Sequence, residues 1–157
     1  MPEASISAVS SHYRTAHFSA RLSAQLKCFI EARMRAAGID DIACAHGDVL
    51  VVLFAHPGAT MSDIARASGR TKATITALVK KLEAAGCVRR TANAGDARSS
   101  RVELTARGES LRGLFESISA QMDAALESAL GADNVRELDR LLALACRRLA
   151  GDAGTGP

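Results

Sequence analysis

The stretch ATMSDIARASGRTKATITALVKKLEAAG, residues 59–86, predicts two short helices joined by a tight turn. Thr60 is a candidate N-cap of the first helix, and Gly69 permits the sharp turn that follows it. Thr71 can cap the second helix and Gly86 can end it. Apolar residues at the helical spacing i, i+3, i+4 and i+7 give the second helix one face for the core: Ile75, Leu78, Val79 and Leu82. Two short helices joined by a glycine-containing turn are typical of a helix-turn-helix.

The other face of the second helix combines hydroxyl groups with cations. Its members are Lys72, Thr74, Thr76, Lys80 and Lys81. A solvated helix face would explain the lysines, but threonine is a mediocre helix former and an exposed helix has little need of several. Short side chains are useful on a helix that reads DNA, because they let its backbone sit deep in the major groove.

A predicted β-hairpin follows the helix-turn-helix. CVRRT (87–91) and SRVELT (100–105) read as two short strands around a small, polar loop. Arg98 on this loop is either part of a solvated hairpin end or aimed at an anion, and a narrow A·T-rich minor groove attracts such an arginine. Ser99 adjoins it. The strand arginines are candidates for phosphate contacts, which position a protein on DNA without reading sequence: Arg89, Arg90 and Arg101.

Longer helices are predicted on both sides of this region. Residues 16–36 carry apolar side chains at helical spacing, Thr105 begins one continuous helix that runs to about residue 130, and a last helix begins at Asp133 or Asn134. GDVLVVLFAHPG (47–58) is ambiguous between a strand and a buried helix. The tail, residues 151–157, has the composition of a disordered segment.

Charge is concentrated in the middle of the chain. The net charge of the 157 residues is +3, but residues 70–112 hold ten basic and four acidic side chains, which gives +6. The segment before this block is neutral and the segment after it carries −3. A basic block between neutral and acidic flanks indicates a surface that faces a polyanion, with a generic basic face as the alternative.

The sequence argues against a membrane protein, a secreted protein, a metal-binding or disulfide-bonded protein and an enzyme. No apolar run reaches the ~18 residues of a membrane span, and the N-terminus lacks a secretory signal, so we expect a cytoplasmic protein. The four cysteines are scattered without a C-x-x-C pair, which predicts neither a metal site nor disulfides, and instead small buried side chains. We find no nucleophile–base pair, phosphate loop or paired acids, so we expect no enzyme and no cofactor.

The motifs together resemble the multiple-antibiotic-resistance regulator (MarR) family. They are carried by MSDIARASGRTKATITALVKKLEAAGCVRRTANAGDARSSRVELTARG, residues 61–108, and the likeness extends over about residues 45–112. The family has a similar recognition helix, a Gly-hydrophobic-Val turn into the wing, an Asp-x-Arg wing tip and a Leu-Thr-x-x-Gly exit. The expected fold is therefore mostly α with a small β-hairpin wing, a winged helix-turn-helix lobe plus dimerisation helices from both termini.

The resemblance implies a single domain over residues 1–157 and an obligate homodimer. Residues 10–40 and 106–150 would supply the dimerisation helices, and residues 45–105 the lobe that binds double-stranded DNA. Lys72, Thr74 and Thr76 then resemble the residues that face the major groove. Arg98 resembles the wing-tip arginine and Asp96 the acid that shapes the tip. The chain departs from the family at Ala97, where a second basic residue is common, and at Arg70, commonly apolar, which we expect to reach towards phosphate.

The predicted function is a sequence-specific transcriptional regulator, a repressor released by a small-molecule effector. The family's effector pocket lies between the dimer helices and the lobe, and His17, Arg21 and His46 are polar groups that could reach it. Capping or surface roles are the alternative for these three. A second reading is a thiol redox sensor that uses Cys28, since a related branch of the family has its reactive cysteine in a similar helix. A third is a winged helix that binds protein without DNA.

Overall fold

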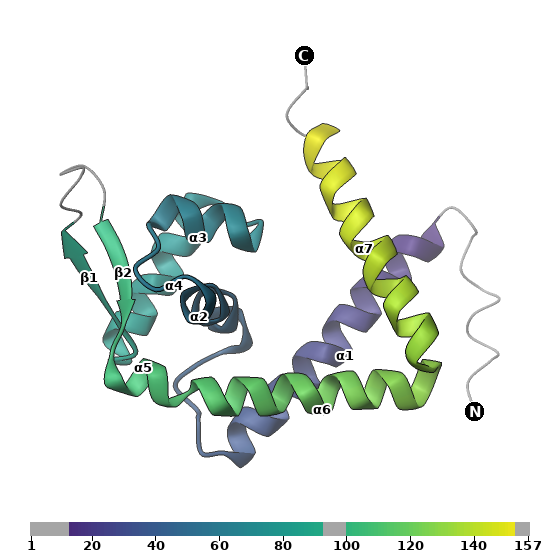
Figure 1. The fold of residues 1–157 in the computed structure, drawn as a ribbon, viewed down its shortest axis with the longest axis horizontal. Coiled ribbons are helices and arrows are strands. Elements are labelled where there is room, and N and C mark those ends of the chain that lie inside the picture. The colour runs from purple at the N-terminus through teal and green to yellow at the C-terminus, as the bar shows by residue number, and fades with distance from the viewer. Residues whose placement is uncertain (1–12, 93–99, 153–157) are drawn as a thin grey trace. The chain divides into compact units, whose positions relative to one another are not determined.

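The computed structural model describes residues 13–92 and 100–152, and these form a mainly helical protein with one β-hairpin (Figure 1). The elements in chain order are α1 (Arg14–Ala36), α2 (Cys44–Ala55), α3 (Met61–Ser68), α4 (Lys72–Ala84), β1 (Val88–Ala92), β2 (Ser100–Leu104), α5 (Ala106–Ser110), α6 (Arg112–Leu130) and α7 (Ala132–Asp152). The fold class predicted from the sequence is confirmed. In the described ranges no helix is long and apolar enough to cross a membrane.

The ambiguous segment 47–58 supplies the central helix of the lobe, α2. Its buried positions recur at helical spacing: Val49, Leu50 and Leu53 are fully buried, whereas Val51 is exposed. A strand would have alternated between faces. Packing on several sides therefore overrides the β preference of the valines, which is weak beside burial.

The helix-turn-helix forms as the local signals predict. Thr60 caps α3 by accepting a hydrogen bond from the Asp63 backbone N–H (3.2 Å). Gly69 then takes the left-handed conformation (φ 64°), which glycine adopts without steric cost. Thr71 caps α4 by accepting from the Thr74 N–H (3.2 Å). The termini of α3 and α4 are thus fixed by residues adjacent to them in sequence.

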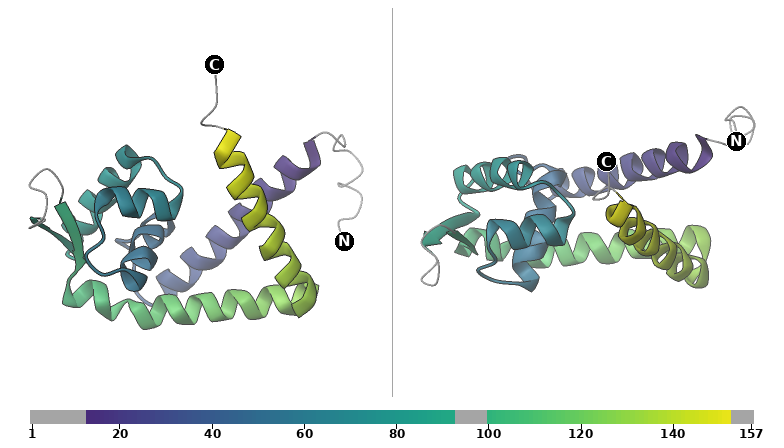
Figure 2. Two further views of the ribbon diagram at one scale, coloured as in Figure 1. Left: turned by 45° about the horizontal axis from the view of Figure 1, so that its top comes forward. Right: turned by 90° about the horizontal axis from the view of Figure 1, so that it is seen from above.

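The antiparallel hairpin pairs Val88 with Leu104 at its base and Ala92 with Ser100 at its described end. Figures 1 and 2 show it beside α4, with the α2–α3 connection along β2. The Val102 N–H donates to the Ala59 carbonyl (2.9 Å). Because Val102 is fully buried, this bond and the side chain together hold β2 against the lobe.

The helix expected to begin at Thr105 and run unbroken to residue 130 is divided in two, so that prediction was wrong. Thr105 does cap α5, but α5 ends at Ser110 and α6 begins at Arg112. Between them the Leu111 N–H donates to the Gly108 carbonyl three residues back (3.3 Å), a tighter turn than an α-helix makes. The break accompanies burial of the Leu111 side chain in the lobe core, a constraint set by the fold.

The chain consists of two compact units that divide between Ile118 and Ser119. In the second unit Gly131 (φ 82°) separates the end of α6 from α7. Residues 151 and 152, expected in the disordered tail, belong to α7, while 153–157 lie outside the described residues. Apolar side chains on α7 remain exposed: Leu141, Leu142 and Leu149.

Candidate nucleic-acid interface

The exposed face of α4 is the most distinctive surface of the lobe. Ile75, Val79 and Leu82 are buried against the core. At about 100° per residue, the centre of the opposite face carries Ala73, Ala77 and Lys80, all exposed. Two alanines at the centre leave the helix backbone open to close approach, as a helix in the major groove requires.

The predicted threonines border this alanine centre, whereas Lys72 lies nearer to the buried side of the helix. Thr74 and Thr76 lie on opposite flanks, and Lys72 is the first residue of the helix. The Thr76 hydroxyl donates to the Lys72 carbonyl (2.8 Å), and the Thr71 and Thr74 hydroxyls bond each other (2.9 Å). The Thr71 and Thr76 hydroxyls thus bond within the helix and its cap, while both residues remain exposed. From the sequence, Ala73 and Ala77 were expected to offer a base little beyond a methyl contact, with specificity resting on Lys72 and the threonines, whereas helical geometry places the two alanines at the centre of the face.

Three of the predicted DNA-binding arginines form ion pairs with acids of the lobe. Arg70 contacts Asp48 of α2 (2.5 Å), Arg89 contacts Glu103 across the hairpin (2.9 Å), and Arg90 contacts Glu83 of α4 (2.8 Å). Arg70 was expected to extend towards phosphate, but in this structure its side chain extends to Asp48 of α2. These pairs are partly exposed, and such pairs contribute at most about 1 kcal/mol each, so phosphate can compete for the arginines.

Arg101 is anchored differently. Its Nη1 donates to the Gly58 carbonyl (3.0 Å), in the turn between α2 and α3. Arg101 lines two clefts at this turn, of about 570 Å³ and 450 Å³. The predicted wing-tip residues Asp96, Arg98 and Ser99 lie outside the described residues.

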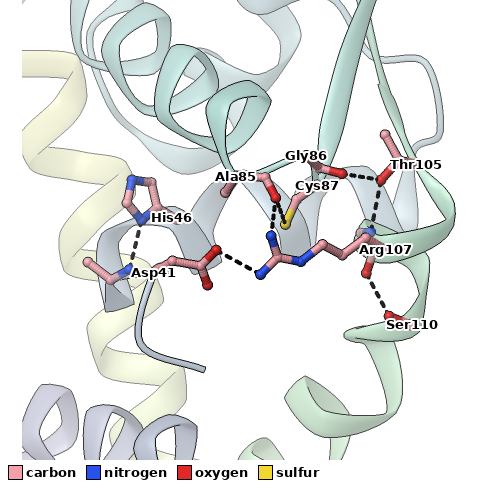
Figure 3. A network of polar contacts seen from close by, with 10 residues as sticks. Asp41, His46, Ala85, Gly86, Cys87, Thr105, Arg107 and Ser110 are labelled. Carbon is pink, nitrogen blue, oxygen red and sulfur yellow. Dashed lines mark hydrogen bonds and ion pairs between the residues drawn. The ribbon is translucent and has the colours of Figure 1, made fainter. Parts of the chain in front are cut away.

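The base of the hairpin is clamped to the end of α4 (Figure 3). The Thr105 hydroxyl donates to the Gly86 carbonyl (2.6 Å), and the Thr105 N–H donates to the Cys87 carbonyl (3.0 Å). Gly108 packs so closely that a Cβ there would overlap the Cys87 carbonyl oxygen. Arg107 donates to the Ala85 carbonyl. Residues just after β2 thus bind three consecutive carbonyls just after α4.

The predicted effector residues are in different environments. His17 and Arg21 lie on α1, where His17 is half-buried and Arg21 is exposed, whereas His46 is buried in the first turn of α2. None of the three lines either cleft at Arg101. His46 Nδ1 accepts from the Ala43 N–H (2.8 Å), but its buried Nε2 has no hydrogen-bond partner within residues 13–92 and 100–152. Burial lowers the pKa of this imidazole, which favours its neutral form.

The cysteines do not share one environment, so the expectation that all are buried was wrong. Cys28 and Cys146 are exposed in the protomer, Cys44 is half-buried and Cys87 is buried. Burial raises the pKa of the Cys44 thiol, with a further contribution from Asp48, and burial also raises the pKa of Cys87. Cys28 faces outwards on α1 because its apolar neighbours Phe29 and Ile30 occupy a different side of the helix. Across the described ranges no three His, Cys, Asp or Glu side chains form a metal-binding group.

Comparison with known proteins decides the family. Residues 38–99 match the model of the MarR family. An HTH-type transcriptional repressor of Mycobacterium tuberculosis is 34% identical over 93 residues, which cover 59% of this chain and 67% of that repressor. The chain belongs to the MarR family. This MarR-family protein is accordingly a transcriptional regulator and not an enzyme.

Solved MarR-family structures agree with the fold. MepR of S. aureus, in a complex with DNA, is 28% identical, with a TM-score of 0.77 over 86% of this chain and 97% of MepR. PcaV of Streptomyces coelicolor, in a complex with its natural ligand, is 23% identical, with a TM-score of 0.77 over 93% of this chain and 98% of PcaV. The PcaV likeness is one of fold alone. In this MarR-family chain α3 and α4 are the helix-turn-helix and β1–β2 is the wing.

Proposed function

We propose that this MarR-family regulator is a homodimeric repressor that binds a pseudo-palindromic DNA operator and is released by a small-molecule effector. The observation that carries the proposal is the exposed face of α4, with Ala73 and Ala77 at its centre and lysines and threonines around them. A helix face with small side chains at its centre and cationic side chains at its edges fits the major groove of DNA. The complex of MepR with DNA supports the same use of the fold.

In the proposed complex α4 enters the major groove and the wing lies over the adjacent minor groove. Lys72, Thr74 and Thr76 face base edges, while Lys80 and the hairpin arginines approach phosphates. Arg89 and Arg90 exchange Glu103 and Glu83 for phosphate oxygens. Because these intramolecular pairs are partly exposed, the exchange requires no buried charge to be left alone. Arg98 at the wing tip is proposed to enter the minor groove.

Dimerisation is proposed through residues 10–40 and 106–150, with residues 45–105 as the DNA-binding lobe. Support comes from the large apolar side chains that the protomer leaves exposed on these terminal segments. They are Tyr13, Phe18, Leu130, Leu141, Leu142 and Leu149. A second copy would cover them, and a two-fold dimer would present two copies of α4 to successive turns of DNA.

Selection of bound fragments from random double-stranded DNA tests this function. We expect enrichment of a pseudo-palindrome whose half-sites are about 10 bp apart, which is one helical turn. Enrichment without a repeated half-site would contradict the symmetric dimer. Absence of any enrichment would favour the alternative of a winged helix that binds protein without DNA.

We propose that a small-molecule effector releases the protein from DNA by binding at His46. Its buried Nε2 carries the proton when Nδ1 accepts from Ala43, so the ring presents a donor without a partner. Because Nε2 is buried, a small molecule with a hydrogen-bond acceptor would satisfy this donor only after the side chains over the ring move apart, and His17 and Arg21 are the further candidates. PcaV, which shares the fold alone, was solved with its natural ligand, so a small molecule can bind to a protein of this fold. A screen for small molecules that release the selected operator, repeated on His46→Phe, tests the assignment.

Redox control through Cys28 is the second candidate, and the exposure of its thiol favours it. Under this candidate, mild peroxide releases the wild type from DNA while Cys28→Ser stays bound. Cys146→Ser is the matched control, since Cys146 is also exposed. If peroxide leaves the wild type bound, Cys28 has no sensing role.

A further inference from the structure

We propose that Arg107 is a positioning residue that fixes the end of α4 to the connection between α1 and α2 and thereby sets specific DNA affinity. Its guanidinium donates to the Ala85 carbonyl and, through Nη2, to Asp41 Oδ2 (2.7 Å) (Figure 3). Asp41 lies in the connection between α1 and α2, and Ala85 immediately follows α4. The inference rests on the proposed function of α4.

The chemistry of arginine suits this role. The planar guanidinium holds several donors in one rigid fork, so one side chain can bind two acceptors on different elements at fixed angles. A lysine has a single nitrogen on a flexible stem and holds such a pair of acceptors less rigidly. Asp41 and Ala85 come from opposite sides of α2 in the chain, so Arg107 joins segments that the sequence keeps apart.

The backbone beneath Arg107 is held on both sides. Thr105 donates to the Gly86 and Cys87 carbonyls, and Gly108 is packed against the Cys87 carbonyl. The base of the Arg107 side chain is therefore fixed relative to the residues it binds. The side chains of Arg107 and Asp41 remain 45% and 47% exposed, and an exposed pair contributes little to overall stability. The geometry therefore supports an effect on the orientation of α4 and not on the stability of the fold.

A small change at the end of α4 is magnified along the helix. The helix has 13 residues and is about 20 Å long, so a tilt of about 3° at its C-terminal end moves its N-terminal end by about 1 Å. A shift of that size distorts hydrogen bonds at base edges, whose useful range is narrow. Phosphate contacts tolerate it better, because long flexible side chains make them.

The test compares Arg107→Gln, Asp41→Asn and the double variant with the wild type. Binding to the selected operator and to an unrelated duplex of equal length is titrated at several salt concentrations. We expect each single variant to lose about 3–10-fold in operator affinity, in the range of coupling between packed residues, and the double variant to lose no more than Arg107→Gln. Affinity for the unrelated duplex and the salt slope should stay unchanged. Arg107→Lys should recover part of the loss.

Two features separate positioning from charge. The two single substitutions change the net charge in opposite directions, so a charge effect would weaken binding in one and tighten it in the other. Amide exchange at Ala85 and Gly86 supplies a readout without DNA, and it should accelerate in both Arg107→Gln and Asp41→Asn.

Three results would overturn the assignment. A salt slope that falls by about 0.9 in Arg107→Gln would make Arg107 a phosphate contact. Equal losses on both duplexes together with a lowered melting temperature would make its role purely structural. If one single variant bound the operator more weakly and the other more tightly, the change in net charge alone would explain the effect of Arg107. Failure of the wild type to prefer any operator is a separate result, which contradicts the proposed function itself.

Discussion

Replacement of Gly108 by alanine should destabilise the lobe. A Cβ at this position would overlap the Cys87 carbonyl oxygen and stand 3.0 Å from the carbonyl carbon and 3.1 Å from Leu104 Cδ2. Since a backbone carbonyl cannot rotate away as a side chain can, α5 must move back from the end of α4.

The cost follows from the bonds that this movement breaks. Three hydrogen bonds cross this contact: from the Thr105 hydroxyl to the Gly86 carbonyl, from the Thr105 N–H to the Cys87 carbonyl and from Arg107 to the Ala85 carbonyl. Loss of three hydrogen bonds costs about 1.5–4.5 kcal/mol, and alanine returns up to about 1 kcal/mol of helix propensity. The free energy of unfolding should therefore fall by about 0.5–4.5 kcal/mol.

Gly113 is the matched control, because it lies in α6 and a Cβ there meets nothing within 4 Å. Gly113→Ala should raise the free energy of unfolding by about 0.5–1 kcal/mol. The same glycine-to-alanine change is thus expected to lower stability at one site and raise it at the other. Urea unfolding at a fixed protein concentration measures both, since the proposed dimerisation would make stability depend on concentration. If Gly108→Ala were as stable as the wild type or more so, the clamp would not constrain the lobe.

Three further outcomes are expected. Because folding lowers the pKa of His46, the neutral side chain contributes stability that is present above about pH 6.5 and lost as the pH falls below it. His46→Gln keeps an acceptor for the Ala43 N–H but does not titrate in this range. The urea midpoint of this variant should therefore change less between about pH 7 and pH 5 than that of the wild type. Leu141→Glu with Leu142→Glu should yield folded monomers by light scattering, and a surviving dimer would exclude α7 from the interface. Arg89→Ala should lower the salt slope of DNA binding by about 0.9, whereas an unchanged slope would mean that Arg89 stays paired with Glu103.

The helix-turn-helix and the hairpin were predictable because their determinants are local. Thr60 and Thr71 cap helices a few residues away, and Gly69 supplies the left-handed turn. The buried stripe of α4 follows from helical spacing, which sequence shows directly. These features require no knowledge of distant contacts.

The rest depends on tertiary contacts that spacing does not reveal. The segment 47–58 forms a helix because several elements pack around it, and the break at Leu111 accompanies burial of one side chain in the core. The partners of Arg70 and Arg107 lie 22 and 66 residues away in the chain. The sequence identified the basic residues of the candidate site, but it could not predict which acids would pair with them.

The exposed centre of α4 as the DNA-reading surface is the central claim, and Ala77→Glu tests it most directly. Ala77 is exposed, and glutamate is a good helix former, so the fold should be kept while bulk and negative charge enter the centre of the face. Ala106→Glu, at the exposed first position of α5, is the control with the same added charge in the same compact unit. In a titration with the selected operator, Ala77→Glu should lose at least about tenfold in affinity, the size of one DNA contact, while Ala106→Glu stays close to the wild type. If Ala77→Glu binds the operator as tightly as the wild type, α4 does not enter the groove.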